Sequence, residues 1–278
     1  MTGGGMSGAA AGTAALDKRQ ARRAETVLIT GASSGIGREL TRLYASDGAR
    51  LVLIARSEDK LRQLADELAA KYGAKAQVVP ADLSRPSSPR EIVATLQQRH
   101  IDVDVLVNDA GFGAHGTLAQ IGVDRQLEMI QVNVGALTQL TALLLPGMLE
   151  RRHGAILNVA SIAAFQPDPN QAVYGATKAY VLSLTEALAE ELRGSGVRVS
   201  CLAPGPTETE WGARAGMLGT RLFRLGVLDA GRVARAGHDG LRLGKTVVIP
   251  GLNNRILVLA VRLSPRFLVA RISAYLQA

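Results

Sequence analysis

The chain has 278 residues, of which 47% are hydrophobic, and this length and composition suit one large folded domain and exclude a disordered protein. Cys201 is the only cysteine, so no disulfide can form within the chain, which suits a cytoplasmic protein. The net charge of +8 leaves two interpretations open, an anionic partner or a solvated basic surface. We expect no nucleic-acid partner, because the sequence has no zinc-finger spacing, RNP-type motif or basic stripe interleaved with aromatic residues.

The two ends of the chain differ in composition from the middle. In residues 1–25 a stretch rich in glycine and alanine comes before a basic stretch, whereas a secretory signal has its positive charge first. This composition predicts a flexible tail. No run of about 18 apolar residues is present, so no transmembrane helix is expected. The main domain is predicted over 26–252. Residues 253–278 form an apolar, arginine-rich extension broken at Pro265, for which peripheral membrane contact and packing within the protein or across a dimer both remain open.

Short apolar runs alternate with helical patterns along the chain. Strands are predicted at 27–30, 51–55, 77–79, 103–107, 155–160, 198–202 and 246–249. Helices are predicted at 38–46, 58–72, from Pro86 and Pro89 to about 99, at 127–150 and at 174–192. The alternation predicts an α/β fold, a single domain with a doubly wound, Rossmann-type parallel sheet and helices on both faces.

A glycine-rich turn joins the first predicted strand to the first helix, with the pattern TGxxxGIG over residues 30–37. Glycines here let the backbone approach a pyrophosphate, and the free N–H groups at the start of the helix face the anion. The alternative is a tight strand–helix turn without a ligand. The candidate cofactor contacts in this turn are Gly31, Ser33, Ser34, Gly35, Ile36 and Gly37.

A second motif follows the predicted strand 155–160, where Ser161 precedes Tyr174 and Lys178. The tyrosine and lysine stand at i and i+4, so they share one face of a helix. A phenol with an ammonium beside it can act as a general acid in one direction of a reaction and as a general base in the other. We expect the Lys178 ammonium to lower the pKa of Tyr174 and the Ser161 hydroxyl to donate a hydrogen bond to the substrate oxygen. Taken alone, a Tyr/Lys pair on a helix is also common as plain structure.

The sequence resembles the short-chain dehydrogenase/reductase superfamily, in its one-domain subtype, over about residues 26–209. The resemblance is carried by the glycine-rich turn followed in order by Ser161, Tyr174 and Lys178. The resemblance implies that Asn133 holds a water that links Lys178 to solvent, and that Lys178 also holds the nicotinamide ribose. Asp109 departs from the family's Asn-Asn-Ala-Gly motif. Further cofactor contacts implied by the resemblance are Asp82, Leu83, Asn108, Ala110, Gly111, Pro204, Gly205, Thr207 and Thr209, besides Tyr174 and Lys178 themselves.

The end of the second strand bears on the choice of nucleotide. An acidic residue there would bind the ribose hydroxyls of NAD(H), but this chain has Ala55 followed by Arg56. A guanidinium can bind a 2′-phosphate through two hydrogen bonds, and Ser33 and Arg38 could assist. Arg56 therefore favours NADP(H) over NAD(H), the alternative being a solvated arginine at the start of a helix.

The expected function is NADP(H)-dependent interconversion of a ketone and a secondary alcohol. Residues 210–228 occupy the position of the family's substrate lid and include several large apolar side chains, which suits a long-chain, acyl or steroid-like substrate as well as plain packing. His115, His153 and His238 are not clustered with carboxylates at ligand spacing, so no metal site is expected, and His115 is expected on a surface loop. The resemblance implies a homo-oligomer. The alternative function is a non-catalytic NADP(H) sensor or scaffold.

Overall fold

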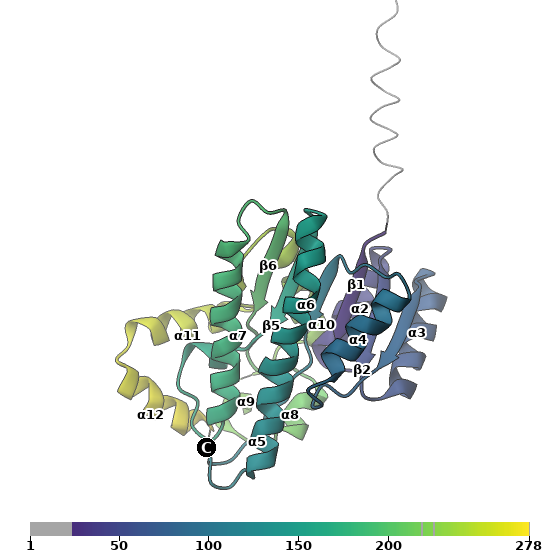
Figure 1. Cartoon of the computed structure of the whole chain (residues 1–278). Helices are drawn as coiled ribbons and strands as arrows, with labels where there is room; N and C mark the ends of the chain where they lie inside the picture. Colours follow the sequence, from purple (N-terminus) through teal and green to yellow (C-terminus); the bar gives the residue numbers. More distant parts are fainter. Residues whose placement is uncertain (1–23, 218, 225, 278) are drawn as a thin grey trace, which may run out of the picture.

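The computed structural model describes residues 24–217, 219–224 and 226–277. Its centre is a seven-stranded, all-parallel sheet in the order β3-β2-β1-β4-β5-β6-β7 (Figure 1). The strands are β1 (Thr26–Thr30), β2 (Arg50–Ala55), β3 (Ala76–Pro80), β4 (Val105–Asn108), β5 (Gly154–Val159), β6 (Val197–Leu202) and β7 (Val247–Val248). The strand order reverses between β1 and β4, and ligands of such sheets bind outside the carboxyl ends of the strands at this point.

Helices cover both faces of the sheet, as the sequence predicted. One layer contains α2 (Gly35–Ser46), α3 (Glu58–Tyr72) and α10 (Ala230–Arg242). The other contains α4 (Ser88–Gln98), α5 (Val123–Ile130), the π-helix η1 (Gln131–Ala136), α6 (Leu137–Glu150) and α7 (Ala172–Glu191). The remaining elements are the 3-10 helix η2 (Ile162–Phe165), α8 (Glu210–Arg214), α9 (Arg221–Arg224), α11 (Leu252–Leu263) and α12 (Arg266–Gln277).

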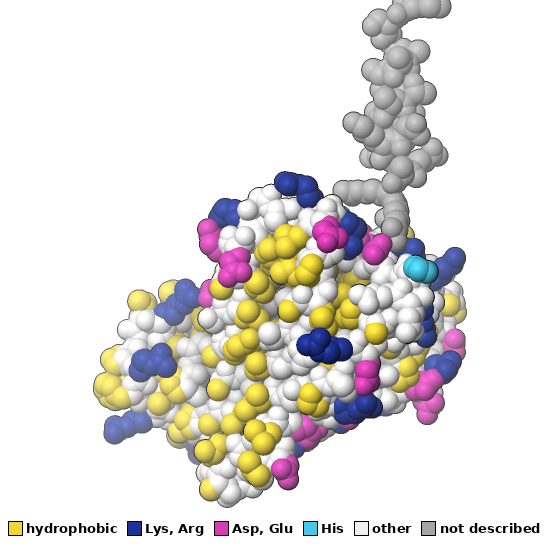
Figure 2. Space-filling model, viewed as in Figure 1, with side chains coloured by type: hydrophobic (Ala, Val, Ile, Leu, Met, Phe, Trp, Pro, Cys, Tyr) yellow, Lys and Arg dark blue, Asp and Glu magenta, His cyan; other side chains and the backbone are white. Residues whose placement is uncertain are grey.

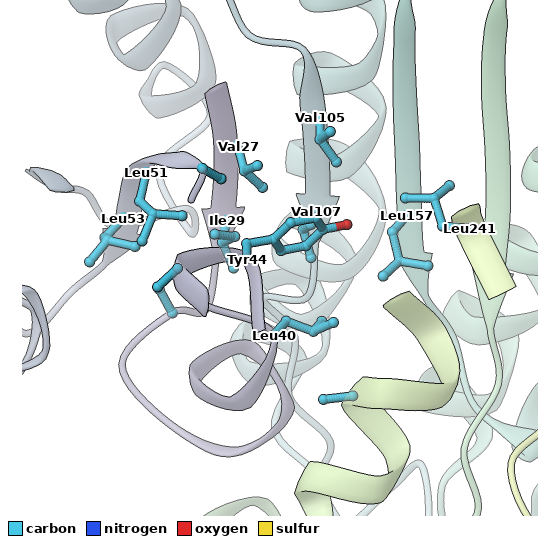
Figure 3. Packing of buried hydrophobic residues seen from close by; sticks show 14 of the residues in the cluster. Val27, Ile29, Leu40, Tyr44, Leu51, Leu53, Val105, Val107, Leu157 and Leu241 are labelled. Atoms are coloured by element: carbon cyan, nitrogen blue, oxygen red, sulfur yellow. The ribbon is translucent and has the colours of Figure 1, made fainter. Parts of the chain in front are cut away.

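Alternating side chains of the central strands supply the two halves of the core. Val27 and Ile29 of β1 face the layer of α2, α3 and α10, where they pack with Leu40 and Tyr44 of α2 (Figure 3). Leu28 points to the opposite face and joins the cluster under α4 and α6. Because both faces of the strand are buried, the middle of β1 is an uninterrupted apolar run, Val27 to Ile29, as is typical of parallel sheets. This rigid frame holds the loops at the carboxyl ends of β1, β4 and β5.

Helix α10 was missing from the sequence prediction. Gly231, Gly237 and Gly240 reduce its apparent helical propensity. A Cβ added at Gly237 would lie 2.7 Å from a Leu202 methyl group, and one at Gly240 would lie 2.3 Å from a Val248 methyl group. These glycines therefore let the helix lie close against β6 and β7, and this requirement is visible only after folding.

The predicted helix 127–150 is one helical segment that begins earlier, at Val123, and contains the π-helix η1. By length and composition alone it could cross a membrane, with a mean hydropathy of 1.4 over its most apolar window, of which 39% is buried. This finding qualifies the expectation that no transmembrane helix is present, which was drawn from the absence of a long apolar run. Its inner face carries Asn133 and Leu140 into the protein core, both of them buried, so we assign it as a core helix of the fold.

Candidate active site

The turn between β1 and α2 has the conformation that its glycines predict. Gly31 and Gly35 have positive φ angles of 70° and 54°, a region that favours glycine. A Cβ at Gly37 would lie 2.5 Å from the Gly31 carbonyl oxygen, so the third glycine sits behind the turn and does not line the cavity. The cavity of about 390 Å³ beside the turn is lined by Gly31, Ser33, Ser34, Gly35 and Ile36. The first turn of α2 carries no acidic residue of its own, which favours an anion at this helix start.

Loops after β4 and β6 complete the cavity. Ala110, Gly111, Pro204, Gly205, Thr207 and Thr209 all line it, as predicted. Thr209 accepts a hydrogen bond from the Trp211 N–H at 3.3 Å and begins α8, and its side chain lies against Gly35. Asn108 lies beneath the cavity and does not line it. Its amide donates to Asn158 at 2.9 Å and to Thr141 at 3.2 Å, so it joins β4, β5 and α6.

The end of the cavity beside β2 is basic. Arg56, at the end of β2, is exposed and lines the cavity together with Asp82 and Leu83. Asp82 also accepts a hydrogen bond from the Ser84 N–H at 3.0 Å, within the turn that follows β3. Lys60 lines the same end, 3.6 Å from Glu210 of α8. It was missing from the sequence prediction, and it lies in the first turn of α3, shortly after Arg56 in the chain.

The predicted catalytic residues come together at the centre of the cavity. Ser161, Tyr174 and Lys178 line it, and the Lys178 ammonium donates to the Val159 carbonyl oxygen at 2.8 Å. Asn133 lies one layer deeper, in the π-helix, where its amide donates to Phe112 and Thr177, each at 3.0 Å. Single-turn π-helices occur frequently at functional sites. This one turns Asn133 toward the loop that follows β4.

Burial dominates the electrostatics of the Tyr–Lys pair. It raises the pKa of Tyr174 above its usual value, while a hydrogen bond with Ser161 lowers it and the Asp168 carboxylate raises it further. The expectation that Lys178 lowers this pKa is therefore wrong for the structure, in which the ammonium lies 5.7 Å from the centre of the tyrosine ring. Burial also lowers the pKa of Lys178 to about 8, and the Asp109 carboxylate opposes that shift.

Asp109, the residue that departs from the family motif, lies between the glycine-rich turn and Lys178. Its carboxyl oxygen is 2.5 Å from the position that a Cβ would take at Gly37, and 3.0 Å from that at Gly31. Burial raises the pKa of Asp109 to about 7, while Lys178 and the Gly37 N–H lower it. A carboxyl group with this pKa is largely neutral below pH 7, so it does not place a full negative charge beside the phosphate turn.

The substrate end of the cavity is largely apolar. Trp211 packs against Tyr174 with ring centres 5.2 Å apart, and Met217 and Phe223 line the same end. These residues belong to the predicted lid, residues 210–228, and its role at the substrate site stays a prediction. Of the other predicted lid residues, Leu218 and the side chain of Leu222 lie outside the described residues.

One polar pair stands at the apolar end of the cavity, and sequence reasoning did not find it. Asp168 and Gln277 are buried there, and the Gln277 amide donates to the Asp168 carboxylate at 2.7 Å. Burial raises the pKa of Asp168 to about 6, while hydrogen bonds with Gln277 and Ser273 and the charge of His115 lower it. His115 lies in a loop, as expected, but it is half-buried there and bonds the Gln277 carbonyl oxygen at 2.8 Å. Within the described residues, no cluster of side chains suits a metal ion.

Comparison with known proteins agrees with this geometry. The family model for short chain dehydrogenases matches residues 25–216. The chain belongs to the short-chain dehydrogenase family. A short chain dehydrogenase of Pseudocercospora fijiensis is 40% identical over 191 residues, which are 68% of this chain but only 62% of that protein. The chain thus spans less than two thirds of the length of this relative.

Solved structures of the family share the whole fold. A short-chain dehydrogenase from Sphingobium yanoikuyae in complex with NADPH is 34% identical, with a TM-score of 0.77 and coverage of 85% of this chain and 92% of that one. A structure of a 7β-hydroxysteroid dehydrogenase is 27% identical, with a TM-score of 0.82 and coverage of 90% and 96%. A member from Burkholderia phymatum in complex with NAD is 29% identical, with a TM-score of 0.76 and coverage of 86% and 92%. The family and fold make this chain an oxidoreductase that uses a nicotinamide cofactor.

Proposed function

We propose that this short-chain dehydrogenase interconverts a bulky apolar ketone and its secondary alcohol with NADP(H). The observation that carries the proposal is the convergence of Ser161, Tyr174 and Lys178 on one cavity, between the glycine-rich turn and the apolar end formed by Trp211. The relatives in complex with NADPH and with NAD support a nicotinamide cofactor of either kind, and the hydroxysteroid dehydrogenase supports a bulky substrate.

The residues of the cavity fit a dinucleotide. Side chains at Gly31, Gly35 and Gly37 would meet neighbouring atoms at 2.5 to 3.1 Å, so the chain keeps the turn free of Cβ atoms. Backbone N–H groups at the start of α2 would then hold the pyrophosphate. Arg56, with Lys60 nearby, would hold a 2′-phosphate. The bound cofactor supplies or accepts the hydride.

The proton chemistry belongs to the protein. In reduction, Tyr174 gives its phenolic proton to the carbonyl oxygen, so that one hydride and one proton convert the C=O group into CH–OH. Burial keeps Tyr174 protonated at neutral pH, which suits a proton donor. Ser161 donates a hydrogen bond to the same oxygen as negative charge develops on it. Lys178 holds a positive charge below this site, and Asn133 links it to solvent through a water.

A ketone panel tests the proposal and its alternative. Purified protein is mixed with NADPH or NADH and with ketones of increasing size, and cofactor absorbance is followed. We expect turnover of at least one bulky apolar ketone, with NADPH preferred. Tight NADPH binding without turnover of any ketone or alcohol would instead support the non-catalytic sensor.

We also propose that the protein is a cytoplasmic homo-oligomer that associates through α5 and α7. Leu127 and Ile130 of α5 are exposed, and Tyr180 projects from the outer side of α7. Figure 2 shows apolar side chains along this face of the molecule. Exposed apolar surface of this kind is typical of an interface between subunits. Light scattering on wild type and Leu127→Asp tests it, with a smaller species expected for the variant.

A further inference from the structure

The C-terminal hairpin, which we define as α11 and α12 (residues 252–277), stands out from the body of the molecule (Figure 1). The two helices are joined at Ser264 and Pro265, where the sequence predicted a break. Helix α11 contacts η2, and α12 contacts α9. The hairpin lies beyond residue 216, where the match to the family model ends.

The inner side of the hairpin is bound to the wall of the substrate cavity. Gln277 at its end bonds Asp168 and His115, as described above. Ser273, one helical turn earlier, accepts a hydrogen bond from Gln166 at 3.2 Å. These bonds hold α12 in one orientation relative to the cavity, so the direction in which the outer side of the hairpin faces is also determined.

The outer side of the hairpin is apolar and exposed. In α11, Leu252, Ile256, Leu259 and Leu263 follow the spacing i, i+4, i+7 and i+11, and each exposes between 57% and 79% of its surface. This spacing places them on one stripe along the helix. Helix α12 continues the exposed apolar surface with Phe267, Leu268, Ile272 and Tyr275. Figure 2 shows apolar surface on the part of the molecule that the hairpin forms.

The charges of the hairpin all have one sign. Arg255, Arg262, Arg266 and Arg271 are exposed, and residues 252–277 contain no Asp or Glu. None of the four forms an ion pair within the described part of the chain. A symmetric dimer through this surface would bring together two faces that carry arginines and no carboxylate, which is unfavourable. An anionic lipid surface complements both the charge and the apolar stripe.

We propose that the hairpin docks on an anionic membrane surface, with its apolar stripe among the lipid headgroups and its arginines on the phosphates. The inner side of the hairpin forms part of the cavity wall, so docking would bring the substrate end of the cavity close to the lipid. If the proposed function holds, the substrate is then a ketone that partitions into the bilayer. The docking itself does not depend on that activity.

Sedimentation of the full chain with phosphatidylcholine vesicles, with and without phosphatidylglycerol, tests the proposal. We expect phosphatidylglycerol to strengthen binding by at least about tenfold and high salt to remove this gain. The double substitution Leu259→Asp and Leu263→Asp should weaken binding by at least about tenfold. The matched control is Leu243→Asp, because Leu243 is an exposed leucine outside the hairpin. NADPH affinity, measured for each variant, shows that the fold is intact.

Three results would overturn the proposal. One is the absence of binding to either kind of vesicle, and another is an equal loss of binding in the Leu243→Asp control. The third is light scattering in which the hairpin substitutions convert an oligomer into a monomer, because the surface would then join copies of the chain. A failure of the ketone panel leaves the vesicle result unchanged, so the two proposals can fail separately.

Discussion

Replacing Asp109 with asparagine tests the electrostatics next to the glycine-rich turn. The pKa of this carboxyl group rises from 3.8 to about 7 in the fold, and each unit corresponds to about 1.4 kcal/mol, so the ionised form costs up to about 4 kcal/mol. The unfolded chain loses this proton first. The contribution of the neutral carboxyl group to the free energy of unfolding is therefore fully present below about pH 4, and it is lost as the pH rises to about 7. Asparagine has a similar shape and cannot ionise.

We therefore expect Asp109→Asn to match the wild type near pH 4 and to be more stable at pH 8. The gain in the free energy of unfolding is at most about 4 kcal/mol. It is reduced by the favourable interaction between Lys178 and the Asp109 carboxylate, which the substitution removes. Urea unfolding at several pH values measures it, with Asp66→Asn as a control because Asp66 is exposed on α3. A difference in stability that stays constant from pH 4 to pH 8 would refute the reasoning.

The same substitution has a catalytic readout. Burial lowers the pKa of Lys178 to about 8, and the Asp109 carboxylate keeps it from falling further. Without that carboxylate, Lys178 loses its proton at a lower pH. The alkaline fall in activity of Asp109→Asn should therefore begin at a lower pH than in the wild type. If the alkaline decrease in activity begins at the same pH as in the wild type, or at a higher pH, the electrostatic coupling of Asp109 and Lys178 is contradicted.

Three further predictions concern the other parts of the site. Tyr174→Phe should reduce turnover by about 10²-fold or more while NADPH affinity, measured by fluorescence titration, stays nearly unchanged, and substantial residual turnover counts against the mechanism. Arg56→Ala should weaken NADPH binding by about tenfold or more and NADH binding little. Equal effects on the two cofactors would contradict the 2′-phosphate role, and so would the same effect in Arg62→Ala, the control at an exposed arginine. Gly37→Ala places a Cβ 2.5 Å from a backbone oxygen and should abolish cofactor binding. The control Gly122→Ala should leave binding unchanged, because a Cβ there meets open space. Cofactor binding that is retained in Gly37→Ala would refute this prediction.

The parts of the site that sequence reasoning found depend on short-range geometry. Gly31 and Gly35 needed only the knowledge that a tight turn favours glycine, and their positive φ angles agree with it. Tyr174 and Lys178 needed the helical period, which places residues four apart on one face, together with the ordered motifs before them. The alternation of strands and helices was sufficient for the parallel sheet, because a parallel pair requires a crossover.

The misassigned features depend on contacts between distant segments. Helix α10 has glycines that reduce its local propensity, and only its contact with β6 and β7 shows why they are there. The pKa of Tyr174 rises because it is buried under Trp211 and beside Asp168, which the spacing to Lys178 does not reveal. Asn108 has the motif's identity but bonds Asn158 on the neighbouring strand instead of facing the cavity.

The sequence by itself determined the parallel sheet, the glycine-rich turn and the Ser–Tyr–Lys set, because each depends on residues close together in the chain or on a regular period. Only the tertiary structure decided where Asp109 lies relative to Gly37, and that Gln277 reaches Asp168 across 109 residues of chain. It also decided which side of the C-terminal hairpin is exposed. Burial and charge at these positions come from segments that meet only in the fold, so no local pattern could predict them.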